Sequence, residues 1–360
     1  MQSMASHQIE STLAQVVVSK PSQSWFHILS STLLFCFISA IAPSASKSLN
    51  LFVDTIADTT DATPADCICS DNSGDCSLRA AVMEANSCPG ADTIFMPGGT
   101  YTLTIPSNFA DNDINSESGD LDVAESVNII GDAIDPVIIS GDGASRIFDV
   151  ANGLNFRLAN LTIENGDPTN IAGNARVSGG AIYALANGRI STSNVIFQNN
   201  IAENGGALYI QSGTHLTMIG SSMIENTATD DAGALFLNSN SRVILSDIDV
   251  VGNTANHNGG VFVIKSTDVD IYIQSSRFIG NASLGAFGIY YDYASETQFG
   301  NNRLVILKST FEDTEQNSGG IFLLSQKNLI VQSSFVNNQS LSPIFGGASV
   351  FTCNTFCQHL

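Results

Sequence analysis

Charged side chains are scarce in this sequence of 360 residues, and basic ones are the scarcest. Asp, Glu, Lys and Arg make up only 13% of the chain, with 13 Lys and Arg against 34 Asp and Glu. The formal net charge is therefore −21. Such an acidic excess repels phosphate backbones and anionic membranes, so nucleic acid is excluded as an expected partner.

Apolar and small residues are abundant instead. Hydrophobic residues account for 43% of the chain, and 30 residues are glycine. An acidic chain with this much apolar material buries a core, so the sequence is not that of a disordered acidic protein.

The segment from Trp25 to Ala42 has no charged residue, follows Lys20 and leads into small residues through Ser46. This pattern is typical of a secretory signal, with an uncleaved membrane anchor as the alternative. We expect residues 1–46 to be a signal peptide. The exported chain is then secreted or on the outer cell surface, with no membrane-spanning domain once the signal is removed.

Six cysteines follow the expected signal, and an even number in an exported protein predicts disulfides. They are Cys67, Cys69, Cys76, Cys88, Cys353 and Cys357. The first four allow three pairings, among which the sequence does not choose. A zinc site is the alternative, but their spacing lacks the paired C-x2-C knuckles of such sites. We expect residues 47–90 to form a disulfide-rich N-terminal cap.

Two short motifs recur in step after residue 179. A small-Gly-small-apolar tag begins at Gly179, Gly205, Ala232 and Gly259, at intervals of 26, 27 and 27 residues. Between the tags runs an apolar-x-x-Asn motif. Two motifs at one period indicate a repeat protein.

Each period contains Gly, an Asn-rich turn and short runs in which apolar and polar residues alternate, which favours strands over helices. A period of this length fits three short strands and three turns. Stacking such coils gives an all-β parallel β-helix, a solenoid of roughly ten coils over residues 91–360.

Equivalent residues of successive coils should stack as ladders. The expected inward stacks are Ile182, Leu208, Leu235 and Phe262, and Phe197, Met223, Val250 and Phe278. The expected turn ladder is Asn200, Asn226, Asn253 and Asn281, because Asn tolerates left-handed backbone and its amide bonds to the next coil.

Two segments interrupt the pattern. An inserted loop is predicted near residues 292–302, holding Tyr290, Tyr291 and Tyr293, and loops on a solenoid commonly carry binding residues. Upstream, Ser77 to Asn86 has helical periodicity with Ser77 as N-cap and a stop at Pro89-Gly90. This helix is expected to cover the open edge of the first coil.

Several segments carry a resemblance to a known family. They are Cys76-Ser-Leu-Arg79, Gly119-Asp-Leu-Asp122, Ser145-Arg-Ile-Phe-Asp-Val150 and Leu161-Thr-Ile163. In them the chain resembles exported bacterial proteins in which a Cys-Ser-Leu-Arg-Glu-Ala cap domain precedes a right-handed parallel β-helix. The repeats are similar to those of chlamydial polymorphic outer-membrane proteins, which are surface adhesins.

The resemblance implies a right-handed β-helix at the cell surface or outer membrane with an adhesin-like role. Ala80 stands where that family has Glu, so a capping box with Ser77 is lost. The chain ends at Leu360 without barrel strands, an anchor helix or a sorting motif, which leaves a fragment and a released protein both open.

Catalytic residues have to be considered, because β-helices also house pectate lyases and polygalacturonases. Asp247 and Asp249 share a strand face by their spacing, as do Asp268 and Asp270. The two pairs differ in their distance from the preceding tag, so they should not stack into a calcium-binding carboxylate cluster. Asp230 and Asp231 alone do not make a glycosidase set, and His215 and His257 are expected to be isolated surface residues. No catalytic, cofactor-binding or metal residue is predicted.

One weak calcium pattern remains, with Asp111, Asp113, Asn115 and Asp122 spaced as in a calcium loop. Ser116 occupies the position that normally needs Gly, and a solvated acidic loop is the alternative.

We expect a non-enzymatic, adhesin-like β-helix that binds extracellular proteins or polysaccharides. The alternative is a polysaccharide lyase or glycoside hydrolase of the pectate-lyase-like type, and a structural envelope spacer is the third hypothesis.

Overall fold

A computed structural model gives the fold of most of the chain from residue 47 onward. It describes residues 47–107, 116–170, 176–265, 268–285, 289–291, 303–312, 315–316, 321–323, 327–336, 338–340, 350–354 and 356–359. The expected signal peptide, the expected loop at 292–302 and the acidic residues Asp111, Asp113 and Asn115 lie outside these ranges.

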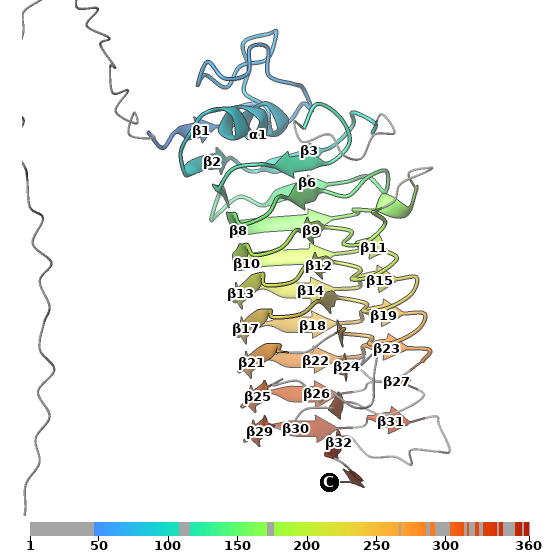
Figure 1. Cartoon of the computed structure of the whole chain (residues 1–360). Helices are drawn as coiled ribbons and strands as arrows, with labels where there is room; N and C mark the ends of the chain where they lie inside the picture. Colours follow the sequence, from blue (N-terminus) through green and yellow to red (C-terminus); the bar gives the residue numbers. More distant parts are fainter. Residues whose placement is uncertain are drawn as a thin grey trace, which may run out of the picture. The chain divides into compact units, whose positions relative to one another are not determined.

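The strands form three sheets, in which strands of successive coils pair side by side (Figure 1). Sheet A contains β1 (Asn50–Phe52), β2 (Asp92–Met96), β3 (Gly99–Thr102), β5 (Val127–Gly131), β6 (Val137–Ser140), β8 (Asn155–Glu164), β10 (Arg189–Gln198), β13 (His215–Ile219), β14 (Ser222–Ile224), β17 (Arg242–Ser246), β18 (Asp249–Val251), β21 (Asp270–Gln274), β22 (Arg277–Ile279), β25 (Arg303–Leu307), β26 (Thr310–Glu312), β29 (Lys327–Val331) and β30 (Ser334–Val336).

The other two sheets are built from shorter strands. Sheet B contains β4 (Leu121–Val123), β7 (Phe148–Val150), β9 (Ile182–Ala184), β12 (Leu208–Ile210), β16 (Leu235–Leu237), β20 (Phe262–Ile264), β24 (Ile289–Tyr291), β28 (Ile321–Leu323), β32 (Val350–Asn354) and β33 (Phe356–His359). Sheet C contains β11 (Ile201–Ala202), β15 (Thr227–Ala228), β19 (Thr254–Ala255), β23 (Ala282–Ser283), β27 (Glu315–Gln316) and β31 (Gln339–Ser340).

The connectivity confirms the predicted all-β parallel β-helix with a short N-terminal helix. From β14 in sheet A the chain passes to β15 in sheet C, then to β16 in sheet B, and returns to sheet A as β17. The ladders between coils are parallel, as between β13 and β17. Only the terminal pair, β32 with β33, is antiparallel among the described strands.

The apolar stacks lie inside the coils. Ile182, Leu208, Leu235 and Phe262 are register partners in sheet B, and Phe197, Met223, Val250 and Phe278 are register partners in sheet A. All eight side chains are fully buried. Because successive strand residues point to opposite faces, their chain neighbours point outward, and Ile196 beside Phe197 is 36% exposed.

The four Asn side chains form a buried ladder. Asn226 Nδ2 donates to Asn253 Oδ1 at 2.9 Å and to the Phe197 carbonyl at 3.0 Å. Asn226 Oδ1 accepts from Asn200 Nδ2 at 2.9 Å, and Asn253 bonds Asn281 in the same way. Each amide therefore satisfies backbone and side-chain groups of the adjacent coil, which removes the cost of burying them.

The Gly-Gly turns depend on glycine for two reasons. Gly205 has a φ of 64°, in the left-handed region. A Cβ at Gly206 would overlap the Gly233 carbonyl oxygen of the next coil. The repeating tag is thus required by the close approach of neighbouring turns.

The N-terminal helix α1 (Leu78–Ser87) contacts β2 and β4 at the first coils. Ser77 Oγ accepts from Ala80 N at 3.0 Å as the N-cap. The Arg79 side chain is fully buried, pairs with Asp58 at 2.6 Å, and donates to the carbonyls of Ser116 and Gly119 at 2.9 and 2.8 Å. The helix is thereby tied to the loop before β4.

A single-turn 3-10 helix, η1 (Pro168–Asn170), follows β8. No helix in the described part of the chain combines the length and apolar character needed to cross a membrane.

Candidate binding sites

The cap cysteines form two disulfides, Cys67 to Cys88 and Cys69 to Cys76. The pairing is one of the three that the sequence left open. At the other end of the chain, Cys353 and Cys357 are register partners in the antiparallel pair of β32 and β33.

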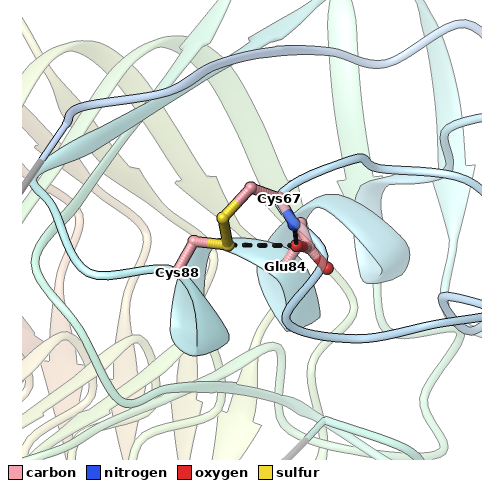
Figure 2. A group of neighbouring side chains, drawn as sticks. All are labelled: Cys67, Glu84 and Cys88. Carbon is pink, nitrogen blue, oxygen red and sulfur yellow. Dashed lines mark hydrogen bonds between the residues drawn. A yellow bond between two sulfur atoms is a disulfide. The ribbon is translucent and has the colours of Figure 1, made fainter.

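Glu84 lies beside the first of these disulfides and is fully buried (Figure 2). Its carboxyl group accepts from the backbone N–H groups of Cys67 and Ala65. Its Oε1 lies 3.1 Å from Cys88 Sγ. A disulfide sulfur has no hydrogen, so that contact is a hydrogen bond only when Glu84 is protonated.

Burial raises the pKa of Glu84, although the backbone donors of Cys67 and Ala65 oppose the shift. Cys67, Glu84 and Cys88 place potential metal-ligand atoms together. Both sulfurs are consumed by the disulfide, however, so the thiolates that zinc requires are not present. Cys67, Glu84 and Cys88 therefore stabilise the fold of the cap.

A buried cluster of charges lies on the outer face of sheet B. Asp149 Oδ2 accepts from Arg146 Nη1 at 3.0 Å and from Arg176 Nη1 at 2.9 Å. Arg146 also pairs with Asp120 at 3.2 Å and is 3% exposed. Two guanidinium groups contact one oxygen of the Asp149 carboxylate and balance its charge. Asp149 therefore has a structural role and is not available as a general base.

Three rings continue this outer face as a row, with Tyr209 stacked between Tyr183 and Phe236 at centroid distances of 5.0 and 4.8 Å. Tyr183 is 9% exposed and Phe236 is 2% exposed. A Cβ at Gly179 or Gly205 would lie 3.1 Å from the ring-bearing Cβ of the next coil, so the Gly turns pack over the rings. The row is a second apolar core and not an open stacking platform for a sugar.

A second polar cluster contains Asp230, Asp231 and His257. His257 Nδ1 lies 3.2 Å from a carboxylate oxygen of each Asp, and the His257 side chain is 64% exposed. Asp231 also accepts from Asn258 at 3.0 Å and faces Lys265 at 3.7 Å. His257 is at the surface as predicted, but it is not isolated.

This cluster has the donor atoms of a divalent metal site. The Lys265 ammonium and the Asn258 donors already occupy the Asp231 carboxylate, and a bound cation would have to displace or repel them. The residues therefore fit an ion-pair network better than a metal site.

The acidic pairs proposed from spacing are separated by the fold. Asp247 and Asp268 lie outside the strands, with φ of 54° and 63°, so the prediction that each pair shares a strand face is wrong. Asp249 pairs in register with Arg277, and Asp270 with Arg242. Register therefore places Asp249 and Asp270 beside arginines and does not stack them on each other.

Asp122 is the described member of the expected calcium loop. Its backbone carbonyl accepts from Ser116 Oγ at 2.9 Å and from Asn86 Nδ2 at 2.6 Å. These contacts link the strand β4 to Ser116 and to α1.

An apolar depression of about 300 Å³ is open on sheet A near the cap. Phe52 is 64% exposed and stacks on Phe95 with a centroid distance of 5.1 Å. Met96, Pro97 and Ile130 complete the apolar wall. Exposed aromatic side chains in a depression are characteristic of interaction surfaces.

No protein family tested matches this chain. No curated protein matches it either. Among solved structures, the chain is similar to the A-module of the mannuronan C-5 epimerase AlgE6 from Azotobacter vinelandii. The match has 13% identity and a TM-score of 0.28, and it covers 84% of this chain and 99% of the A-module.

Proposed function

We propose that this protein is a secreted or cell-surface β-helical protein that binds extracellular proteins or polysaccharides, in an adhesin-like role and without catalysis. The observation that carries the proposal is the exposed Phe52 ring, stacked on the half-buried Phe95 in an apolar depression. A soluble protein that leaves a ring 64% exposed beside other apolar side chains has a surface suited to a partner.

The charged clusters support a non-catalytic role. Asp149 is held between two arginines, and Asp231 between Asn258 and Lys265. A general base needs an available carboxylate near the reacting proton, and both carboxylates are engaged by structural partners. The resemblance of the cap and repeats to exported bacterial β-helix proteins and chlamydial surface adhesins is consistent with this role.

One experiment distinguishes a binding function from a catalytic one. The purified exported chain is applied to immobilised extracellular-matrix proteins, acidic and neutral polysaccharides and whole cells, with and without calcium, and the supernatants are analysed for cleaved or modified glycan. We expect retention on at least one surface, no glycan product, and weaker retention for Phe52→Ser.

A matched control is Ile134→Ser, which removes a side chain that is 90% exposed but lies outside this depression. Equal retention of the wild type and both variants would mean that the apolar depression does not take part in binding. A glycan product that is lost on changing one acidic residue would replace binding by the enzymatic alternative, a polysaccharide lyase or glycoside hydrolase.

A further inference from the structure

The outer face of sheet A carries basic residues in one line. Arg189 pairs in register with His215, His215 with Arg242, Arg242 with Asp270 and Asp270 with Arg303. The next register partner of Arg303 is Lys327. We call this line the cationic row; its cations are Arg189, Arg242 and Arg303, and His215 and Asp270 lie at the intervening coils. Parallel in-register strands are about 4.8 Å apart per coil, so the arginines recur about every 9.6 Å.

The cationic row has few counter-charges, although the chain as a whole is strongly acidic. Within the described residues, Arg189 and Arg242 are exposed and form no ion pair. Arg303 pairs with Asp270 at 2.9 Å, and both Arg303 and Arg242 lie over the Tyr272 ring, at 4.8 and 5.4 Å. Asp270 is thus the single acid within the row.

The adjacent outward row contributes no acid. From β8 to β25 its residues are Arg157, Ser191, Thr217, Ile244, Tyr272 and Val305. Arg157 is exposed and adds another positive charge. The face is therefore a positive strip on an anionic protein.

The other half of the same sheet has a different charge pattern. There Glu164, Asp249 and Glu312 point outward at their own strand positions, and Arg277 pairs with Asp249 at 3.5 Å. Acids are thus more frequent in this half, whereas Asp270 is the single acid on the line of the cationic row. Arg189 and Arg242 form no ion pair within the described residues, so ion pairing does not explain their places in the row.

We propose that the cationic row binds a linear polysaccharide of uronic acid units, lying along the solenoid axis. A hexuronic acid unit is about as long as one coil step of about 4.8 Å, so alternate carboxylates along the polymer meet the arginines of every second coil. Guanidinium groups bind carboxylates through two parallel hydrogen bonds. The inference rests on the proposed function, for which it names a ligand class.

The test measures binding of the full exported chain to immobilised polygalacturonate at low salt and at physiological salt. Arg189→Gln with Arg242→Gln should weaken binding about tenfold or more, because two charge-assisted contacts are lost. The control, Arg277→Gln with Lys308→Gln, removes the same charge from exposed positions outside the row and should change binding less than about twofold. Asp270→Asn removes the single acid of the row and should tighten binding.

The possible results distinguish a failure of the polyuronate assignment from a failure of the proposed function. No binding of polygalacturonate, equal weakening by the two double variants, or stronger row-dependent binding of heparin or duplex DNA would overturn the polyuronate assignment. Retention on a protein or neutral glycan alone would overturn the proposal that the cationic row binds polyuronate, and the proposed binding function would still hold. Row-dependent binding followed by polygalacturonate cleavage would support the row and overturn the non-catalytic function.

Discussion

The cap and the coil stack are stabilised in opposite ways. In the cap each stabilising contact occurs once: two disulfides, the Ser77 N-cap and the buried Arg79 to Asp58 pair. In the coils one contact recurs at every turn, as the Asn ladder from Asn200 to Asn281 illustrates.

The difference matters because each coil contacts only its neighbours, so its stability is approximately a sum of local terms. Damage to one coil should spread to adjacent coils and fade with distance. The stabilising contacts of the cap do not repeat, so a substitution that removes one of them should destabilise the cap as a whole. The edge of the first coil would then be exposed to solvent.

The largest expected effect is in the coils. Phe197→Ala should lower the free energy of unfolding by about 3 to 5 kcal/mol, because it leaves a cavity in a fully buried stack. Hydrogen exchange should rise most in β10 and β14 and less in distant coils. The matched control, Ile196→Ala, changes the outward neighbour on the same strand and should cost less than about 1 kcal/mol. A uniform rise in exchange over all coils would contradict the local character of the stack.

The next effect concerns the cap. Cys67→Ser with Cys88→Ser opens a disulfide that spans 21 residues and should cost about 3 kcal/mol, because the unfolded cap regains chain freedom. Opening Cys69 to Cys76, which spans 7 residues, should cost less. Hydrogen exchange of α1 and β2 provides the measurement. If the shorter disulfide proves the more important, chain entropy does not explain the cap's stability.

A smaller effect is expected for one member of the Asn ladder. Asn226→Ala leaves the Phe197 carbonyl and the Asn200 N–H without their side-chain partner, which should cost about 1 to 3 kcal/mol. Asn226→Asp should be at least as destabilising, because a carboxylate lacks the donor that the ladder needs. Denaturant unfolding of both variants checks this. A neutral Asn226→Ala would mean that apolar packing alone sets the register.

The smallest effect is the pH dependence of the cap. The folded pKa of Glu84 is raised above its ordinary value of 4.5, so the folded cap binds more protons than the unfolded cap just above that value. Stability of the cap should therefore fall as pH rises from 4.5 through the folded pKa. Asp92, whose pKa burial raises from 3.8, adds a change of the same sign at β2.

Glu84→Gln keeps one carbonyl oxygen as acceptor and has no titration, so it should flatten the dependence and change cap stability by about 1 kcal/mol. Hydrogen exchange of α1 across the acidic range supplies the measurement. A cap that becomes more stable as pH rises, in the wild type only, would contradict the expected sign.

The fold was predictable because the repeat itself encodes it. Gly179, Gly205 and Gly259 mark equivalent turns, and the residues between them alternate between the interior and the surface. Phe197 and Met223 are one period apart in the sequence and one coil apart in the structure. Period and alternation are local properties, so they are visible without coordinates.

The candidate sites were not predictable in the same way. His257 looked isolated because Asp230 and Asp231 lie a full coil earlier in the chain. Asp149 and Arg176 are likewise separated by most of a coil. Arg79 gave no sign of being fully buried, since its partner Asp58 precedes the helix by a long loop.

The sequence by itself determined the strand repeat, the inward ladders and the position of the capping helix, because each follows from residue type and spacing. The tertiary structure decided which cysteines pair, which carboxylates are neutralised, and that Arg189, His215, Arg242 and Arg303 form one line. The physical reason is register. A slip of one residue between coils turns every side chain to the opposite face, and the contacts that fix that register join residues a full coil apart.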